Sequence, residues 1–176
     1  MSHHDLPPAE IVWQGKYITV RKQGTWEYVG RARNIHAAVI LAVDDGHILL
    51  VDQYRVPLKA RCIELPAGLV GDEEEGEEIE IAAARELEEE TGYRPGRLET
   101  VGRFSSSPGM VSETFTLVRA FDLIKTGEGG GVAHEDIRVH RVPLAEITAF
   151  VAEQRAAGYF IDVKLLVALG GDLLKA

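Results

Sequence analysis

The segment Glu78-Ile-Glu-Ile-Ala-Ala-Ala-Arg-Glu-Leu-Glu-Glu-Glu-Thr91, followed by Gly92, decides the fold of this chain. It is rich in alanine and glutamate, which favour helices, and it contains no internal glycine or proline. Gly92 stands just past the expected helix end, where a left-handed backbone conformation makes glycine common. We therefore predict a helix over residues 78–91.

Three carboxylates of this helix share a face with small apolar side chains. Measured from Ile79 at about 100° per residue, that face contains Ala82, Ala83, Glu86, Glu89 and Glu90. Like charges three and four residues apart destabilise a helix, and the single guanidinium of Arg85 cannot neutralise three carboxylates. Mg²⁺ prefers oxygen ligands and is commonly held by carboxylates together with substrate phosphates. The pattern therefore predicts metal-assisted chemistry on a phosphate ester or anhydride.

The acidity of the chain is concentrated around this helix. The 176 residues carry 19 Lys and Arg against 28 Asp and Glu, a formal net charge of −9, and residues 72–90 hold 11 of the acids and one of the bases. An acidic chain without a basic block is a poor candidate for binding nucleic acid through its phosphates. We therefore expect no nucleic-acid partner.

Other features of the composition favour a cytoplasmic protein. Cys62 is the only cysteine, which excludes an intrachain disulfide and suits a reducing compartment. The longest fully apolar run, residues 37–43, is far shorter than the ~20 residues of a membrane span. Residues 1–8 lack the basic and apolar regions of a secretion signal. We expect no membrane partner, and a buried Cys62.

Strand patterns flank the predicted helix on both sides. Asp45-Gly46 between two apolar runs predicts a hairpin. Strands outnumber helices, and their order predicts a mixed α/β domain over residues 34–176, preceded by a small β arm over residues 1–33. Two further helices are expected over residues 144–157 and 162–169. The predicted strands cover residues 11–13, 17–21, 26–31, 35–43, 47–54, 61–65, 98–104, 114–121 and 137–142.

The spacing of this region resembles a known family signature. The pattern Gly71-x5-Glu77-x7-Arg85-Glu-Leu-x-Glu-Glu-x-Gly-Tyr93 matches the Nudix box at every defined position. The chain is therefore identified as a member of the Nudix hydrolase family. The resemblance implies a Nudix fold, with a mixed β-sheet sandwiched between helices (α/β/α). It also implies that water attacks a phosphorus of a nucleoside diphosphate linked to a second moiety, with two or three Mg²⁺ or Mn²⁺ ions per site.

Segments outside the box are similar to one branch, the ADP-ribose (ADP-sugar) pyrophosphatases. They are residues 25–31, 53–57 and 64–68, together with Pro108, which lies 15 residues after Tyr93. The branch hydrolyses ADP-ribose to AMP and ribose 5-phosphate. One alternative is a different substrate: GDP-mannose, NADH, a dinucleoside polyphosphate or a nucleoside triphosphate. Another is a Nudix-fold metabolite sensor without hydrolysis, although such sensors commonly lose box carboxylates and this box is complete.

The resemblance also assigns roles to residues in and near the box. The expected metal ligands are four carboxylates and a main-chain carbonyl: Glu77, Glu86, Glu89, Glu90 and Ala67. The segment from Gly68 to Glu77 is three residues longer than usual in these relatives, which bears on the position of Ala67. Glu77 has a second possible role, because an acid stabilises the first turn of a helix. Arg85 is expected to pair with and orient the carboxylates.

The remaining roles concern the attacking water and the substrate. The resemblance makes Glu135 the expected general base, with Glu113 as the competing candidate. Trp26 offers a flat face for adenine stacking, with core packing as the alternative, and Arg55 suits bidentate contacts to the diphosphate. The β arm is too short to bury a core alone, so it should pack on another surface. The resemblance implies that this surface belongs to a partner subunit, and a homodimer formed through the arm is expected. The expected substrate contacts are Trp26, Glu27, Arg31, Arg55, Glu64, Pro108, Gly109 and Met110.

Overall fold

The structure is a computed structural model of the whole chain and describes residues 6–32, 35–71, 76–132, 135–166 and 169–170. No helix in these ranges is long and apolar enough to cross a membrane. The helices are α1 (Ile79–Thr91), α2 (Ile147–Ala156) and the short 3-10 helices η2 (Leu144–Glu146) and η3 (Val163–Leu165). The strands are β1 (Glu10–Gln14), β2 (Ile18–Gln23), β3 (Trp26–Arg31), β4 (His36–Asp44), β5 (His47–Arg55), β6 (Ala60–Glu64), β7 (Ala67–Val70), β8 (Tyr93–Arg94), β9 (Arg97–Phe104), β10 (Phe115–Phe121), β11 (Ile124–Lys125), β12 (Arg138–Pro143) and β13 (Phe160–Ile161).

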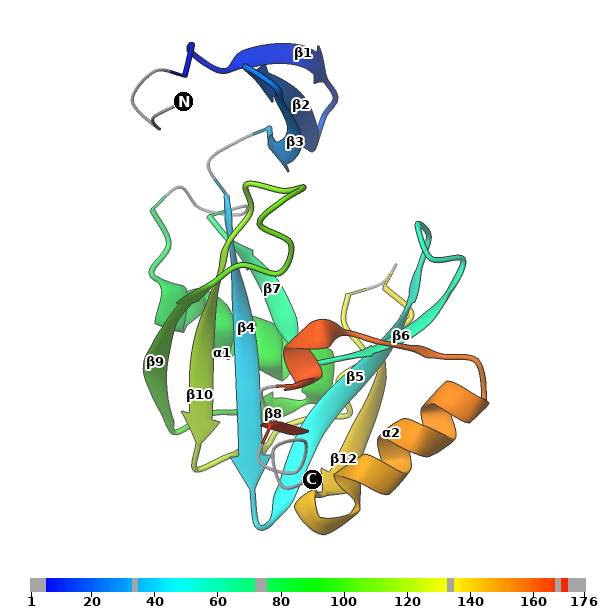
Figure 1. Cartoon of the computed structure of the whole chain (residues 1–176). Helices are drawn as coiled ribbons and strands as arrows, with labels where there is room; N and C mark the ends of the chain where they lie inside the picture. The colour runs from blue at the N-terminus through cyan, green and yellow to red at the C-terminus, as the bar shows by residue number, and fades with distance from the viewer. Residues whose placement is uncertain (1–5, 33–34, 72–75, 133–134, 167–168, 171–176) are drawn as a thin grey trace.

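The main sheet consists of two groups of strands that meet at the β4–β5 hairpin (Figure 1). In one group β7 and β10 flank β4, and β9 lies beyond β10; in the other β6 and β12 flank β5, and β13 lies beyond β6. The pairings β4–β10 and β6–β13 are parallel, and the others are antiparallel. β4 and β5 pair with each other only beside their turn, through Val43 with Ile48 and Asp44 with His47. The sheet is therefore mixed, as the sequence predicts.

Alternate residues of the central strands face two different cores, because successive side chains of a strand point to opposite sides. Ala38 and Val118 pack in the core beneath α1, whereas Val39 and Leu117 pack in a core that includes residues of α2 and η3. Helices thus cover both sides of the sheet, which confirms the α/β/α class. The buried apolar residues of α1 on one side are Ala82, Ala83 and Leu87, and those of α2 and η3 on the other are Ile147, Val151 and Leu165.

The central helix ends where the sequence predicts. Glu78 is its N-cap, and Gly92 follows its last residue in a left-handed conformation, with φ of 74° and an N–H that donates to Glu88 O. A Cβ atom on Gly92 would lie 2.2 Å from Gly127 O, so only glycine fits there. Residues 127–131 form a glycine-rich loop, in which the N–H of Gly130 donates to Glu90 O at 2.9 Å. The end of α1 is therefore packed against the loop that leads to β12.

The N-terminal strands form a separate antiparallel sheet at one end of the main domain, with the order β1-β2-β3 (Figure 1). We call residues 10–31 the arm sheet. Two hydrogen bonds fasten its third strand to the loop before β10: Val29 N–H donates to Met110 O at 2.9 Å, and Ser112 N–H donates to Val29 O at 2.8 Å.

The structure differs from the sequence prediction in a few elements. No strand was predicted directly after residue 65, but residues 67–70 form β7, which pairs with β4. The strands β8, β11 and β13 were not predicted, and each has only two residues. The predicted helix over residues 144–157 begins with η2 and continues as α2. The predicted helix over residues 162–169 opens with η3, and residues 167–168 lie outside the described ranges.

Candidate active site

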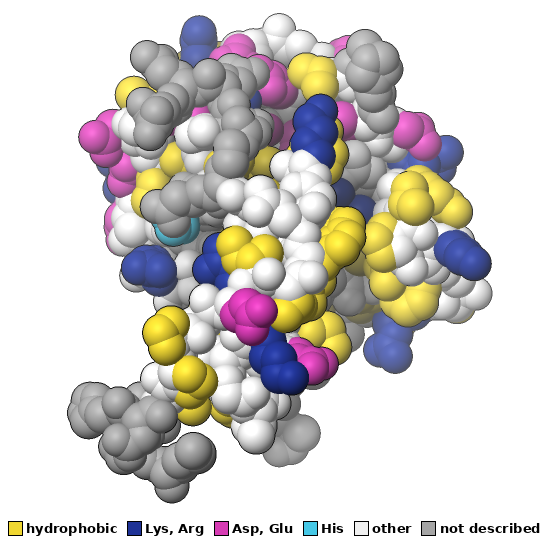
Figure 2. Space-filling view, turned by 90° about the horizontal axis from the view of Figure 1, so that it is seen from above, with side chains coloured by type: hydrophobic (Ala, Val, Ile, Leu, Met, Phe, Trp, Pro, Cys, Tyr) yellow, Lys and Arg dark blue, Asp and Glu magenta, His cyan; other side chains and the backbone are white. Residues whose placement is uncertain are grey.

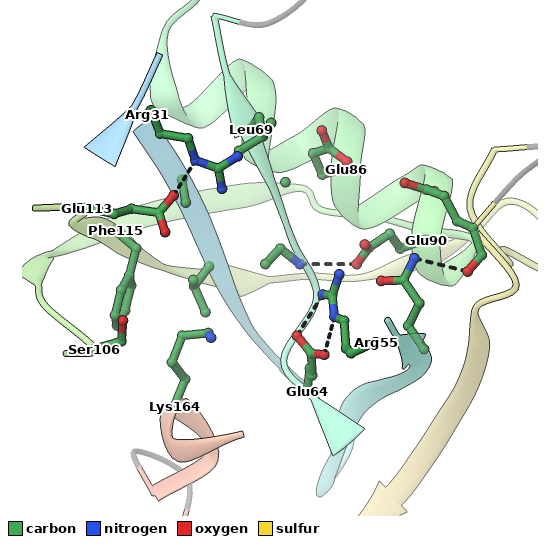
Figure 3. Close-up of a pocket in the computed structure, with 16 residues that line it drawn as sticks. Arg31, Arg55, Glu64, Leu69, Glu86, Glu90, Ser106, Glu113, Phe115 and Lys164 are labelled. Carbon is green, nitrogen blue, oxygen red and sulfur yellow. Dashed lines mark hydrogen bonds and ion pairs between the residues drawn. The ribbon is translucent and has the colours of Figure 1, made fainter. Parts of the chain in front are cut away.

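A cavity of about 400 Å³ lies between the two strand groups and the end of α1 (Figure 3). Five carboxylates and three cationic side chains line it, and small residues of β4 and β7 form part of its wall. We call it the main pocket. Its lining residues are Arg31, Ala37, Val39, Gln53, Arg55, Glu64, Ala67, Gly68, Leu69, Glu86, Glu90, Ser106, Glu113, Phe115, Glu135 and Lys164.

Glu90 is a buried carboxylate of α1, with 7% of its surface exposed. Burial, together with the nearby carboxylates of Glu86 and Glu135, raises its pKa to about 8. The N–H of Ala67 donates to Glu90 Oε2 at 3.1 Å and acts in the opposite direction, as does Arg55. Glu90 is thus a carboxylate whose ionised form lacks sufficient positive charge nearby, which is the environment that a cation would stabilise.

Glu86 reaches the main pocket across β7, and a glycine makes that approach possible. A Cβ atom built on Gly68 would lie 1.9 Å from Glu86 Cδ, so any larger residue would displace this carboxylate. Ala67 also lines the pocket. The extra residues of the Gly68–Glu77 segment therefore do not remove Ala67 from the site, because β7 continues to Val70 before the chain turns away.

Arg85 pairs with three carboxylates of the box, as the sequence predicts. Its Nη1 lies 3.0 Å from Glu86 Oε1 and 3.5 Å from Glu89 Oε2, and its Nε lies 3.4 Å from Glu77 Oε1. Glu77 Oε2 also accepts from Gly71 N–H at 3.3 Å. Glu77 therefore joins the start of the box to Arg85. The N-cap of α1 is Glu78 and not Glu77, and the Glu78 side chain makes no capping hydrogen bond.

Two arginines that line the main pocket are held by acids (Figure 3). Arg55 donates from Nε and Nη2 to the two oxygens of Glu64, at 2.6 and 2.8 Å. Arg31, from the arm sheet, donates from Nε to Glu113 Oε1 at 2.6 Å. A bidentate pair fixes the plane of a guanidinium. The pair with Glu64 uses Nε and Nη2 of Arg55, and the terminal nitrogen Nη1 lies outside it.

Glu135 enters the main pocket on a loop that is fastened at both ends. Gly131 N–H donates to Glu89 O at 3.0 Å before it, and Gln53 Nε2 donates to the Glu135 carbonyl at 3.0 Å. Arg61 holds the next residue, Asp136, through its carboxylate and its carbonyl, each at 2.7 Å. Arg61 also pairs with the buried Asp52. The loop thus ties the candidate base both to α1 and to β5–β6.

Some predicted site residues lie elsewhere in this single chain. Glu77 and Glu89 contact Arg85 but do not line the main pocket, and within the described ranges no group of three His, Cys, Asp or Glu side chains is placed to hold a metal ion. The expected substrate contacts that lie outside the lining are Trp26, Glu27, Pro108, Gly109 and Met110. Trp26 is 54% exposed and Met110 is 65% exposed, so neither is core packing.

Eight lining residues were absent from the predicted site: Ala37, Val39, Gln53, Gly68, Leu69, Ser106, Phe115 and Lys164. Gln53 belongs to a segment that the resemblance singles out, so it could have been found. Phe115 stacks on Phe104, with ring centroids 5.7 Å apart, and lies at the start of an ordinary apolar strand. Lys164 pairs with Asp162 at 2.5 Å and reaches the pocket only because η3 packs across the sheet. No local pattern reveals that packing.

The geometry can be compared with known proteins. The sequence model of the NUDIX domain matches residues 32–162. A methanol dehydrogenase activator of Bacillus methanolicus is 34% identical over 133 residues, 75% of this chain and 68% of that protein. An ADP-ribose pyrophosphatase of Bacillus subtilis (strain 168) is 43% identical over 86 residues, 49% of this chain and 45% of that protein. A GDP-mannose pyrophosphatase of Cronobacter sakazakii is 33% identical over 167 residues, 87% of this chain and 82% of that protein.

A solved structure shares the fold over almost the whole chain. The crystal structure of an ADP compounds hydrolase superposes with a TM-score of 0.72 at 24% identity and covers 97% of this chain and 94% of that one. This likeness confirms the predicted fold. Since the domain match also extends over most of the chain and includes the box and its helix, the chain belongs to the NUDIX family.

Proposed function

We propose that this protein hydrolyses the diphosphate of ADP-ribose or a related ADP-sugar, giving AMP and a sugar phosphate. The observation that carries the proposal is the main pocket itself, where box carboxylates and two arginines that can bind phosphate oxygens face one another. Relatives named ADP-ribose pyrophosphatase and ADP-sugar pyrophosphatase, from Bacillus subtilis and Mus musculus, support the choice of substrate. The complete box argues against a sensor that binds without hydrolysis.

Enzymes of this family generally need a divalent metal ion. The residues present suit such an ion, since Glu90 is buried and short of positive charge and Gly68 leaves room for Glu86 over β7. We propose that Glu86, Glu90 and the Ala67 carbonyl bind Mg²⁺ or Mn²⁺, with two or three ions in all. Glu77 and Glu89, which contact Arg85 in this structure, are proposed as further ligands of these ions. A bound ion would neutralise phosphate charge and lower the pKa of a coordinated water.

Within that site, each remaining side chain has a definable task. Arg55 is held flat by Glu64, which leaves Nη1 to bind a diphosphate oxygen. Glu135 lines the main pocket, and we assign it as the base that takes a proton from the attacking water. Glu113 is the weaker candidate because its carboxylate is engaged by Arg31 at 2.6 Å.

The two candidate bases can be separated by kinetics. Glu135→Gln should lower kcat by 10²-fold or more, the usual contribution of general-base catalysis, while Mg²⁺ affinity changes little. Glu113→Gln should act mainly on KM, because its partner Arg31 lines the main pocket. The reverse pattern would transfer the base assignment to Glu113.

The arm sheet supports a proposal about assembly. Its exposed large hydrophobic side chains include Ile11, Trp13, Tyr17 and Trp26, each more than half exposed. Figure 2 shows hydrophobic side chains on the arm sheet in the view from above. We propose that two copies associate through this sheet in the cytoplasm, so that Trp26 and Glu27 contact substrate in the partner's pocket. A monomeric mass by light scattering at micromolar concentration would contradict the dimer.

The substrate is tested by a hydrolysis panel with Mg²⁺. We expect kcat/KM for ADP-ribose to exceed that for NADH, dinucleoside polyphosphates and nucleoside triphosphates by at least tenfold. GDP-mannose is the strongest competitor, because a GDP-mannose pyrophosphatase aligns with 87% of this chain. A higher kcat/KM for GDP-mannose would leave the proposed diphosphate hydrolysis unchanged and would assign GDP-mannose as the substrate in place of ADP-ribose.

A further inference from the structure

A second cavity, of about 230 Å³, lies where the arm sheet meets the main domain. Three arginines project into it: Arg21 from β2, Arg31 from β3 and Arg103 from β9. Among the described residues that line it, the one carboxylate is Glu113. The side chains around this cavity therefore carry a net positive charge, although the protein as a whole has a net charge of −9. We call it the junction cavity.

Two of its arginines are held by hydroxyl groups. Arg21 Nε donates to Thr19 Oγ1 at 3.2 Å, and Arg103 Nη2 donates to Thr114 Oγ1 at 3.1 Å. Within the described ranges neither guanidinium forms an ion pair with a carboxylate, whereas Arg31 is paired with Glu113. A hydroxyl fixes the position of a guanidinium without neutralising it. The arrangement thus holds positive charges near one another, and an anion would relieve their repulsion.

The chemistry and size of the junction cavity indicate which anion. Guanidinium groups form paired, charge-assisted hydrogen bonds with phosphate oxygens, and the hydroxyl of Ser112 provides a further polar group in the lining. The volume is below the range of roughly 300–1,000 Å³ that holds drug-sized ligands. It suits one phosphate group and not a complete nucleotide.

We propose that the junction cavity is a second anion site, which binds a phosphate group beside the main pocket. Arg31 and Glu113 line both cavities, so the two are adjacent. The phosphate has two possible sources with the same chemistry. It is either a phosphomonoester on a ligand that extends from the main pocket or a free inorganic phosphate.

The site itself is tested without turnover. Inorganic phosphate is titrated into the metal-free, full-length protein by calorimetry, at constant ionic strength maintained with chloride. We expect saturable binding that Arg103→Gln and Arg21→Gln each weaken at least fivefold. The matched control is Arg94→Gln, an exposed arginine of β8 that lines neither cavity, and it should bind like the wild type. Circular dichroism confirms that each variant is folded.

Two results would overturn the site. One is the absence of saturable phosphate binding. The other is binding that Arg55→Gln weakens but Arg103→Gln and Arg21→Gln do not, which would place the phosphate in the main pocket. Because neither measurement requires hydrolysis, both are independent of the proposed function.

The source of the phosphate is tested by kinetics, and this second experiment rests on the proposed function. With Mg²⁺, kcat/KM is compared for ADP-ribose and for its 2′-phosphorylated derivative. A preference of tenfold or more for the derivative that disappears in Arg103→Gln assigns the phosphate to the ligand. Equal kcat/KM values, together with the phosphate binding described above, assign it to free phosphate. Failure to hydrolyse either compound would refute the proposed function and leave the binding result intact.

Discussion

The buried Glu90 makes the stability of the metal-free protein depend on pH in a calculable way. Its folded pKa of about 8 is raised above the ordinary value of 4.5, so the folded state retains a proton that the unfolded state has lost. This contribution to stability is complete below pH 4.5 and disappears as the pH rises through 8. Between pH 5 and pH 8 the wild type should lose on the order of 3 kcal/mol of unfolding free energy through this group, at 1.36 kcal/mol per pKa unit.

Glu90→Gln removes the titration while keeping the shape of the side chain. In EDTA, its unfolding free energy relative to wild type should be higher at pH 8 than at pH 5 by on the order of 3 kcal/mol. The assay is urea unfolding at both pH values. The control is Glu88→Gln, on the opposite face of α1 at 100° per residue and outside the main pocket. Parallel pH profiles for Glu90→Gln and the wild type would refute the reasoning.

Three other perturbations test separate parts of the structure. Gly68→Ala should leave stability within about 1 kcal/mol, because the displaced group is the end of a flexible side chain, but it should weaken Mg²⁺ binding at least tenfold by calorimetry, since Glu86 must move. Arg61→Ala should destabilise the protein by about 3 kcal/mol in urea unfolding, because the partner Asp52 is buried, whereas Asp136→Ala removes an exposed partner and should cost less than about 1 kcal/mol. Burial, with a smaller effect of nearby acids, raises the pKa of the Cys62 thiol to about 12. Alkylation of Cys62 at pH 8 should therefore be about a thousandfold slower in the folded protein than in denaturant. Equal rates would contradict the burial of this thiol.

The main helix and most long strands could be predicted because their signals are local. Alanine content, the absence of glycine and proline, and Gly92 define α1, and apolar runs on either side of Asp45-Gly46 define the β4–β5 hairpin. The sequence prediction missed β7 and the two-residue strands β8, β11 and β13, which have no such signal. Residues 93–94 are a strand only because residues 124–125 pair with them, and residues 160–161 only because they lie beside β6. Two-residue strands are formed by tertiary contacts, which a single sequence does not display.

The contacts of the candidate site are likewise of two kinds, those that local spacing predicts and those that depend on tertiary packing. Arg85 reaches Glu86 and Glu89 within one helical turn, and their spacing predicts those contacts. The pair of Arg31 with Glu113 joins residues 82 positions apart, and it depends on the bonds between β3 and the loop before β10. Spacing along the chain therefore identifies the acidic helix, but it does not identify the residues that surround it.

The contacts between residues that are far apart in the sequence determine how charge is distributed around the site. Residues 72–90 contain the whole acid excess, yet the arginines are not spread evenly over the rest of the surface. Arg55 and Arg31 reach the main pocket opposite α1, and Arg21 and Arg103 gather beside it in the junction cavity. A polyanion would be repelled by α1 alone and attracted by these arginines. The fold thus places the arginines proposed to bind phosphate next to the carboxylates proposed to bind metal, and neither arrangement follows from the net charge.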